Sequence, residues 1–223
     1  MKLRTAVILG ATGLVGGNCL QLLLQDSHYK QVLALGRRAA PVQHTKLVQH
    51  EVNLAQPETY AHWLGPQTDF FCCLGTTIAT AGSEEAFRQV DYTYPLTVAR
   101  AGAQHADNHW LMVSSLGADA KSALFYSRVK GEIERDVARL SFAGVHILQP
   151  SLLLGERAEF RLGEKIAEIA ALPLGLLMVG PLRKYRPIEA ATVARAMQSI
   201  AHTGRAGLEI IVSDKLAELG ENH

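Results

Sequence analysis

The sequence is short of cysteine and of any pattern that would export the protein. Three of the 223 residues are cysteines, and two of them, Cys72 and Cys73, are adjacent within an apolar run. Neighbouring thiols in a strand-like segment are poor material for a disulfide framework, so we expect reduced thiols. The first residues run into a predicted strand without a signal-peptide cleavage pattern. We therefore expect a cytoplasmic protein.

Charge of one sign and long apolar runs are also scarce. The 22 basic residues nearly balance the 21 acidic ones, which leaves a net charge of +1 with no run of like charges. Nucleic acid or an anionic membrane surface is therefore not expected as the main partner. The apolar stretch 169–182 is interrupted by Pro173 and is shorter than the ~20 residues of a membrane span. Partners should be small molecules or other proteins.

Ligands for a metal are few as well. His105 and His109 have the four-residue spacing of a metal-binding pair, but no third ligand accompanies them. We expect a surface loop at this point and no metal site.

What the sequence does contain is an alternation of short apolar runs and helical patterns. Strands are predicted at 5–9, 31–35, 46–52, 69–74, 110–114, 145–148 and 208–212. Between them, residues such as Val15 and Cys19, or Val129 and Ile133, give each helix one apolar face. The pattern predicts one α/β domain over 1–223, a Rossmann-type doubly wound parallel sheet with helices on both faces.

The segment 151–187 departs from this alternation. It combines a helical piece at 164–171 with an apolar, proline-containing stretch that is too irregular for another strand. We expect a small C-terminal cap, an insertion in the single domain, whose stretch 169–182 forms a wall or lid of a substrate pocket. A partner-binding or membrane-grazing face is the alternative for that stretch.

A glycine-rich turn follows the first predicted strand. In Gly10-Ala-Thr-Gly13-Leu-Val-Gly16, the three glycines suit a sharp turn, a close approach to a pyrophosphate and tight packing of the next helix. The second strand then ends in Arg37 and Arg38, without the carboxylate usual in NAD sites. Guanidinium groups match a 2′-phosphate, so we infer NADP(H) rather than NAD(H). Two solvated surface arginines are the alternative.

A possible catalytic set lies downstream. Hydride reduction of a carbonyl needs a proton donor and a hydrogen-bond donor at the oxygen, roles that suit Tyr126 and Ser115. Lys130 lies one helical turn after Tyr126, where its charge favours phenolate. The alternative is a packing role for Tyr126 and a solvated Lys130.

These residues together resemble the short-chain dehydrogenase/reductase superfamily. Four motifs resemble its atypical branch around bacterial relatives of the HIV Tat-interacting protein: Phe71-Cys-Cys-Leu-Gly-Thr-Thr77, Val113-Ser-Ser-Leu-Gly-Ala-Asp119, Phe125-Tyr-Ser-Arg-Val-Lys-Gly-Glu132 and Tyr185-Arg-Pro-Ile188. The resemblance implies a Rossmann fold, NADP(H) and catalysis by Ser115, Tyr126 and Lys130. The predicted cofactor contacts are Gly10, Thr12, Gly13, Leu14, Val15, Gly16, Arg37, Arg38, Asn53, Leu74, Gly75, Thr76, Val113, Ser114, Tyr126, Lys130, Pro150 and Ser151.

The sequence departs from the superfamily pattern at two positions. Asp91 stands where many members have an asparagine that organises a proton relay, and its carboxylate can pair with Lys130. Gln149 stands where relatives often have arginine before proline, which removes a charge near the nicotinamide end. Ser115 lies further towards the rim than Ser114, although loop length leaves either serine available for catalysis.

The sequence thus favours an NADP(H)-dependent oxidoreductase that acts on a small, partly apolar carbonyl or alcohol. A non-catalytic NADP(H)-sensing protein and an epimerase or dehydratase that recycles its cofactor are the alternatives. By analogy with the superfamily, helices near 84–104 and 125–140 are expected to form a homodimer interface.

Overall fold

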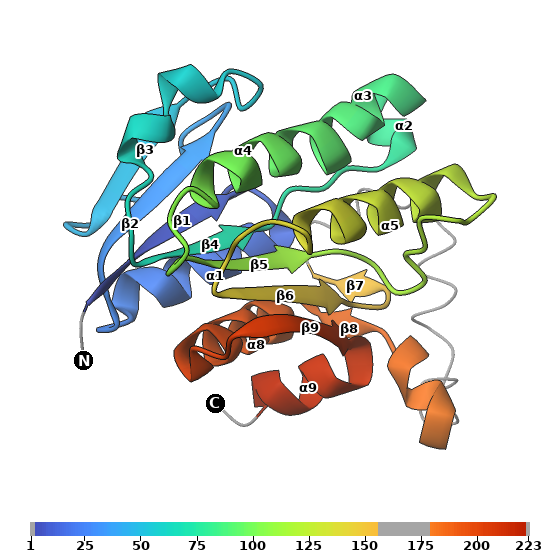
Figure 1. Cartoon of the computed structure of the whole chain (residues 1–223). Coiled ribbons are helices and arrows are strands. Elements are labelled where there is room, and N and C mark those ends of the chain that lie inside the picture. Colours follow the sequence, from blue (N-terminus) through green and yellow to red (C-terminus); the bar gives the residue numbers. More distant parts are fainter. Residues whose placement is uncertain (1–2, 156–178, 222–223) are drawn as a thin grey trace.

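The computed structural model describes residues 3–155 and 179–221, and its centre is a seven-stranded sheet (Figure 1). The strand order is β3-β2-β1-β4-β5-β6-β9, and every neighbouring pair is parallel. This order reverses beside β1, so the carboxyl ends of β1 and β4 border a crevice. The strands are β1 (Arg4–Leu9), β2 (Tyr29–Gly36), β3 (Leu47–Glu51), β4 (Thr68–Cys72), β5 (His109–Val113), β6 (Gly144–Gln149) and β9 (Gly207–Val212).

Helices cover both faces of the sheet, which confirms the predicted doubly wound α/β fold (Figure 1). One face packs against α1 (Leu14–Gln25), α8 (Ala190–Thr203) and α9 (Ser213–Glu221). The other packs against α4 (Tyr94–Gly102) and α5 (Phe125–Val137). Shorter turns complete this side: 3₁₀ helices Pro57–Thr59 and Ala61–Trp63, α2 (Ile78–Ala81), α3 (Glu84–Arg88) and a π-helical turn Gln89–Thr93.

The central strands are mostly apolar because both of their faces are buried. All five residues of β4 are buried, and the consecutive side chains of Phe70 and Phe71 enter the two opposite cores. Gly102 of α4 lets the helix approach Phe70 closely, since a Cβ there would lie 2.6 Å from the ring. The layers are therefore fixed by packing around the middle of the sheet.

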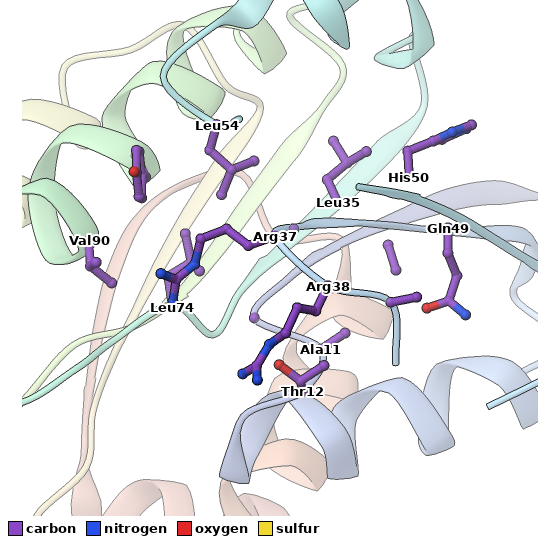
Figure 2. Close-up of a pocket in the computed structure, with 15 residues that line it drawn as sticks. Ala11, Thr12, Leu35, Arg37, Arg38, Gln49, His50, Leu54, Leu74 and Val90 are labelled. Carbon is purple, nitrogen blue, oxygen red and sulfur yellow. The ribbon is translucent and has the colours of Figure 1, made fainter. Parts of the chain in front are cut away.

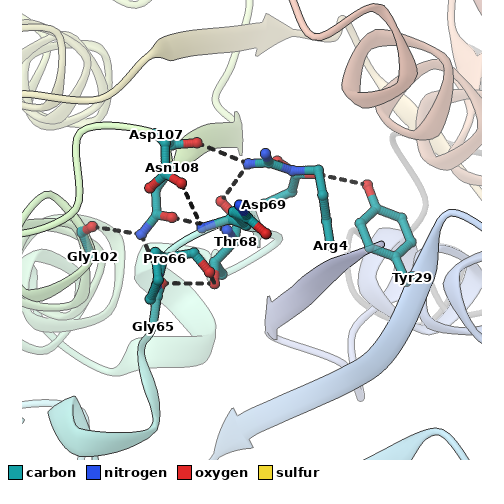
Figure 3. Close-up of polar contacts among 10 residues, drawn as sticks. Arg4, Tyr29, Gly65, Pro66, Thr68, Asp69, Gly102, Asp107 and Asn108 are labelled. Atoms are coloured by element: carbon teal, nitrogen blue, oxygen red, sulfur yellow. Dashed lines mark hydrogen bonds and ion pairs between the residues drawn. The ribbon is translucent and has the colours of Figure 1, made fainter. Parts of the chain in front are cut away.

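A polar network holds the strands together at the rim opposite the crevice (Figure 3). Arg4 donates to Asp69 at 2.8 Å, and the Tyr29 hydroxyl donates to the other oxygen of the same carboxylate at 3.0 Å. Arg4 also donates to the carbonyl oxygen of Asp107 at 3.0 Å. These contacts link β1, β2 and β4 to the turn before β5, so the amino ends of the strands have a structural role.

The cap and one loop differ from the sequence-based expectations. A two-stranded parallel pair, β7 (Leu153–Leu154) with β8 (Ile188–Glu189), and a 3₁₀ helix, Gly180–Tyr185, lie within or beside the predicted cap. The predicted helix at 164–171 and most of the stretch 169–182 lie outside the described residues. The surface loop expected at His109 is wrong, because His109 begins β5 and is buried.

Candidate functional site

The glycine-rich turn joins β1 to α1 at the crevice. Gly10 has φ +80°, and a Cβ on it would lie 2.6 Å from the carbonyl oxygen of Cys73. A Cβ on Gly16 would overlap the carbonyl oxygen of Gly10. Gly13 precedes α1, whose first turn has no acidic side chain and no side-chain cap. The first N–H groups of α1 thus face the crevice with a partial positive charge, as an anion site requires.

One end of the crevice is a pocket between the glycine-rich turn and the end of β2 (Figure 2). Arg37 and Arg38 are exposed there, and neither has an ion-pair partner among the described residues. Figure 2 shows Arg38 extending towards Thr12 and Arg37 towards Leu74. The predicted residues Gly10, Thr12, Arg37, Arg38 and Leu74 all line this pocket.

Two predicted contacts lie outside the walls of the crevice. Asn53 is exposed, and its side-chain oxygen accepts the backbone N–H of Ala55 at 3.1 Å. The neighbouring Leu54 lines the pocket in its place, because the turn after β3 points that side chain inward. Gly16 lies beneath the turn and supports it by close packing.

The other end of the crevice is a larger cleft, and Leu74 lines both parts. It brings together most of the predicted set: Gly13, Leu14, Val15, Leu74, Gly75, Thr76, Val113, Ser114, Ser115, Tyr126, Lys130, Pro150 and Ser151. Lys184 and Tyr185, from the 3₁₀ helix, also line it. They fall in the predicted cap, but nothing in their spacing distinguished them from surface residues.

Lys130 forms a buried ion pair with Asp91. Its Nζ lies 2.7 Å from Asp91 Oδ1, and the side chains are 6% and 0% exposed. The other carboxylate oxygen accepts the backbone N–H of Thr76 at 2.9 Å. Burial alone lowers the pKa of Lys130, but the charges of Asp91 and Tyr126 outweigh it and raise that pKa above 10.5. The alternative of a solvated Lys130 is therefore wrong.

The π-helical turn Gln89–Thr93 supplies Asp91 to this pair. Such a turn has one more residue per hydrogen-bonded ring than an α-helix, and it often marks a functional position. Here it places a buried, charged side chain at the cleft. The pairing expected between Asp91 and Lys130 is present.

Tyr126 opens α5 one turn before Lys130. Its side chain lines the cleft, and its ring lies 5.5 Å from that of Phe87. The residue is 37% exposed, and its charge is one of the causes that raise the pKa of Lys130. Tyr126 therefore combines packing with access to the cleft.

The two adjacent serines have different partners. Ser114 is buried, and its hydroxyl donates to Glu134 Oε1, a carboxylate that also accepts from Gln149 Nε2. Ser115 makes one long hydrogen bond, 3.3 Å, to the carbonyl oxygen of Leu116. Burial raises the pKa of Glu134, against the lowering effect of the hydrogen bonds from Ser114 and Gln149. Of the two serines, Ser115 keeps its donor more available to a ligand.

The sequence analysis missed Glu134. Two features of the sequence could have identified it. Glu134 lies four residues after Lys130 and so shares its helix face. It is also a carboxylate next to the apolar stripe of Val129, Ile133 and Val137. All of these residues are buried.

Comparison with known proteins identifies the family. No family model matches the chain. Protein FMP52, mitochondrial, of Coccidioides immitis (strain RS) is 33% identical over 217 residues, which cover 92% of this chain and 88% of that protein. Protein HTATIP2 of Rattus norvegicus is 30% identical over 228 residues, which cover 100% of this chain and 91% of that protein. The chain belongs to the HTATIP2/FMP52 family. The resemblance to atypical short-chain dehydrogenases/reductases is thereby confirmed.

Solved structures with the same fold include dehydrogenase-type proteins and sugar-nucleotide epimerases. A short chain dehydrogenase family protein from Francisella tularensis has TM-score 0.67 at 12% identity and covers 97% of this chain and 100% of that chain. A UDP-N-acetylglucosamine 4-epimerase from Methanobrevibacter ruminantium M1 has TM-score 0.69 at 15% identity, with coverage of 99% and 81%. At such low identity these likenesses show the Rossmann fold alone.

The family relationship corrects the expected cytoplasmic location. The fungal relatives from Coccidioides immitis and Candida albicans, which match nearly the whole chain, are named as mitochondrial proteins. A low cysteine content argues against secretion. It does not distinguish one reducing compartment from another. In the described parts of the chain, no helix is long and apolar enough to cross a membrane.

Proposed function

We propose that this protein is an NADP(H)-dependent oxidoreductase that interconverts a small carbonyl compound and its alcohol. The observation that carries the proposal is that Tyr126, Ser115 and the buried Lys130–Asp91 pair line the same cleft as the start of α1. Residues from β1, β4, β5 and β6 meet there because parallel strands direct their carboxyl ends to one rim.

The residues of the crevice fit a dinucleotide phosphate. The glycine-rich turn packs tightly, since side chains at Gly10 and Gly16 would collide with backbone, and Gly13 and the start of α1 line the cleft where a pyrophosphate would bind. Arg37 and Arg38 have no ion-pair partner among the described residues, so their guanidinium groups are available to a 2′-phosphate. When bound, the nicotinamide ring supplies or accepts the hydride.

The side chains of the cleft have separate roles in the proposed reaction. Tyr126 donates the proton that the reduced oxygen requires, and it accepts that proton in the reverse direction. Ser115 donates a hydrogen bond to the same oxygen as negative charge develops on it. Lys130 stabilises the phenolate form of Tyr126, while Asp91 holds Nζ in place and offsets part of its charge.

The apolar walls favour a substrate with an apolar body. Leu116, Leu152, Leu153 and Val212 contribute to the cleft beside Tyr126. Their burial by a ligand contributes binding in proportion to the apolar area removed from water.

Tyr126→Phe tests the reaction. The variant keeps the ring that packs on Phe87 but lacks the hydroxyl, so NADPH-dependent reduction of a panel of carbonyl compounds should fall about 10²- to 10⁴-fold. Binding of NADPH, followed by fluorescence, should change little. Tyr92→Phe, which removes a hydroxyl bound to Asp136 and outside the cleft, is the matched control. Equal turnover by Tyr126→Phe and the unchanged protein would contradict the catalytic role.

A non-catalytic NADP(H) sensor is the second candidate. Asp91 favours it, because a carboxylate paired with Lys130 offsets the charge on which an acidic Tyr126 depends. This role predicts that Tyr126→Phe leaves the biological activity intact. An epimerase or dehydratase would instead hold its dinucleotide tightly without net NADPH consumption.

A further inference from the structure

Glu134 is a buried carboxylate behind the wall of the cleft. It lies on α5 one turn beyond Lys130 and is 7% exposed. Its Oε1 and Oε2 accept from Gln149 Nε2 at 3.1 and 3.0 Å, and Oε1 also accepts from the Ser114 hydroxyl. Among the described residues no cation lies within ion-pair distance of it. Glu134 is therefore satisfied by two neutral donors, both of which line the cleft.

This arrangement fixes the orientation of the Gln149 side chain. A carboxamide has a donor side and an acceptor side, and a carboxylate accepts only from the donor side. With Nε2 held by Glu134, the oxygen Oε1 is the polar atom of Gln149 left for a ligand. It has no hydrogen-bond partner among the described residues. Ser114 likewise directs its hydroxyl hydrogen to Glu134, so its oxygen can still accept.

We propose that Glu134 makes Gln149 and Ser114 a pair of hydrogen-bond acceptors that recognises a neutral donor, such as a hydroxyl group, next to the reacting carbonyl of the substrate. The inference rests on the proposed function. It adds the class of substrate: a hydroxy ketone or hydroxy aldehyde with an apolar body. Gln149 is the specificity-determining residue, and Glu134 is a positioning residue that acts through it.

The position of Gln149 predicts that anionic substrates are disfavoured. An arginine there would offer charged donors to a carboxylate. Gln149 offers an acceptor instead, and it turns lone pairs towards the space that a carboxylate would need. An unpaired polar contact of this kind costs affinity, so the cleft should discriminate between a hydroxyl group and a carboxylate.

Three aryl ketones that differ in one substituent test the proposal: 2-hydroxyacetophenone, acetophenone and phenylglyoxylate. Their binding is measured by calorimetry on the protein with NADP⁺, where no reduction occurs, and without it. The unchanged protein should bind 2-hydroxyacetophenone roughly threefold to tenfold more tightly than acetophenone, as one neutral hydrogen bond allows, with phenylglyoxylate weakest.

Variants assign the preference to the two residues. Gln149→Leu should abolish the preference for the hydroxyl group, and Gln149→Arg should favour phenylglyoxylate. Glu134→Gln should weaken the discrimination against phenylglyoxylate, since the Gln149 amide can then turn and donate from Nε2 to the carboxylate. The double variant Glu134→Gln, Gln149→Glu exchanges the carboxylate and the amide, so an acceptor again faces the substrate. The original order of the three affinities should then return. The preference is a ratio of affinities, so partial loss of folded protein does not change it.

Several results would overturn the proposal. These are equal affinity for the three ketones, no measurable binding of any of them, or an unchanged preference in Gln149→Leu. A Gln149→Leu protein that loses affinity for NADP⁺ but keeps its ketone preference would assign Oε1 to the cofactor. If the protein does not reduce ketones with NADPH but still prefers the hydroxy ketone, the proposed oxidoreductase activity is contradicted. The proposed acceptor pair of Gln149 and Ser114 then still holds. If Glu134→Gln does not fold, the two Gln149 variants decide.

Discussion

Asp91 is the residue whose charge most directly affects the chemistry of the cleft. Its carboxylate lies 2.7 Å from Lys130 Nζ and is fully buried. Asp91→Asn would leave the lysine charge less compensated, so the phenolate form of Tyr126 would be favoured. The reduction rate, which needs the protonated hydroxyl, should then fall.

The same substitution removes one partner of a buried ion pair and should cost about 3–5 kcal/mol of unfolding free energy. Steady-state kinetics, together with chemical denaturation, measure both effects, and the exposed Asp107→Asn at the opposite rim of the sheet serves as the control. A reduction rate that stays the same or rises would contradict the role assigned to Asp91.

The two serines make a second test at the scale of single residues. Ser115→Ala removes the donor available to the substrate oxygen, so kcat should fall about 10²- to 10³-fold. Ser114→Ala removes one donor from Glu134 and should act mainly on substrate choice and stability. Steady-state kinetics of the two variants with one ketone separate the roles. A larger loss of kcat in Ser114→Ala would mean that Ser114, and not Ser115, donates to the substrate oxygen.

Residues with a demanding local geometry were the predictable ones. Gly10 and Gly16 could be identified because the turn leaves no space for a side chain. Tyr126 and Lys130 could be identified because helical spacing places them together. Asn53 does not line the pocket, because position after a strand does not fix which way a side chain points. Glu134 was missed because its partners come from β5 and β6, far away in the sequence.

At the scale of elements, α1 and α8 are joined by a carboxylate. Asp26 Oδ2 accepts from Gln198 Nε2 at 2.6 Å and lies 2.6 Å from His202 Nε2. Burial raises the pKa of Asp26, but hydrogen bonds from Gln198, the His28 N–H and His202 together lower it below 3.8. A depressed folded-state pKa contributes stability that is present above pH 3.8 and is lost as the pH falls through the folded value.

Asp26→Asn should therefore destabilise the protein by about 1–2 kcal/mol at neutral pH, with the difference shrinking below about pH 3.8. Thermal unfolding across this range provides the measurement, with Asp214→Asn, at a partly exposed position on α9, as control. A difference that persists unchanged into strong acid would mean that the contact acts through packing.

The regular elements followed from the sequence more closely than the cap did. Strands such as β4 could be predicted because burial on both faces requires a continuous apolar run. The short β7 and β8 strands contain two residues each and pair across more than thirty positions. Patterns of that length carry no periodicity, so the 3₁₀ helix that brings Lys184 and Tyr185 to the cleft could not be anticipated.

At the scale of the whole molecule, the strand order puts the glycine-rich turn, Arg37 and Arg38, and the proposed catalytic set along one crevice. The Rossmann fold could be predicted from the alternation of strands and helices because right-handed crossovers leave few other topologies. The cellular location could not be predicted, because the amino-acid composition does not depend on the compartment in this way. The homodimer expected through α4 and α5 stays a prediction.

Selective binding of NADPH tests the account most directly. Fluorescence titration with NADPH and NADH compares the unchanged protein with the Arg37→Ala, Arg38→Ala double variant and with Arg139→Ala, an exposed arginine on another surface. We expect tighter binding of NADPH than of NADH, and a loss of about tenfold or more in NADPH affinity in the double variant alone. Equal affinity for the two dinucleotides, or no binding of either, would contradict the proposed function.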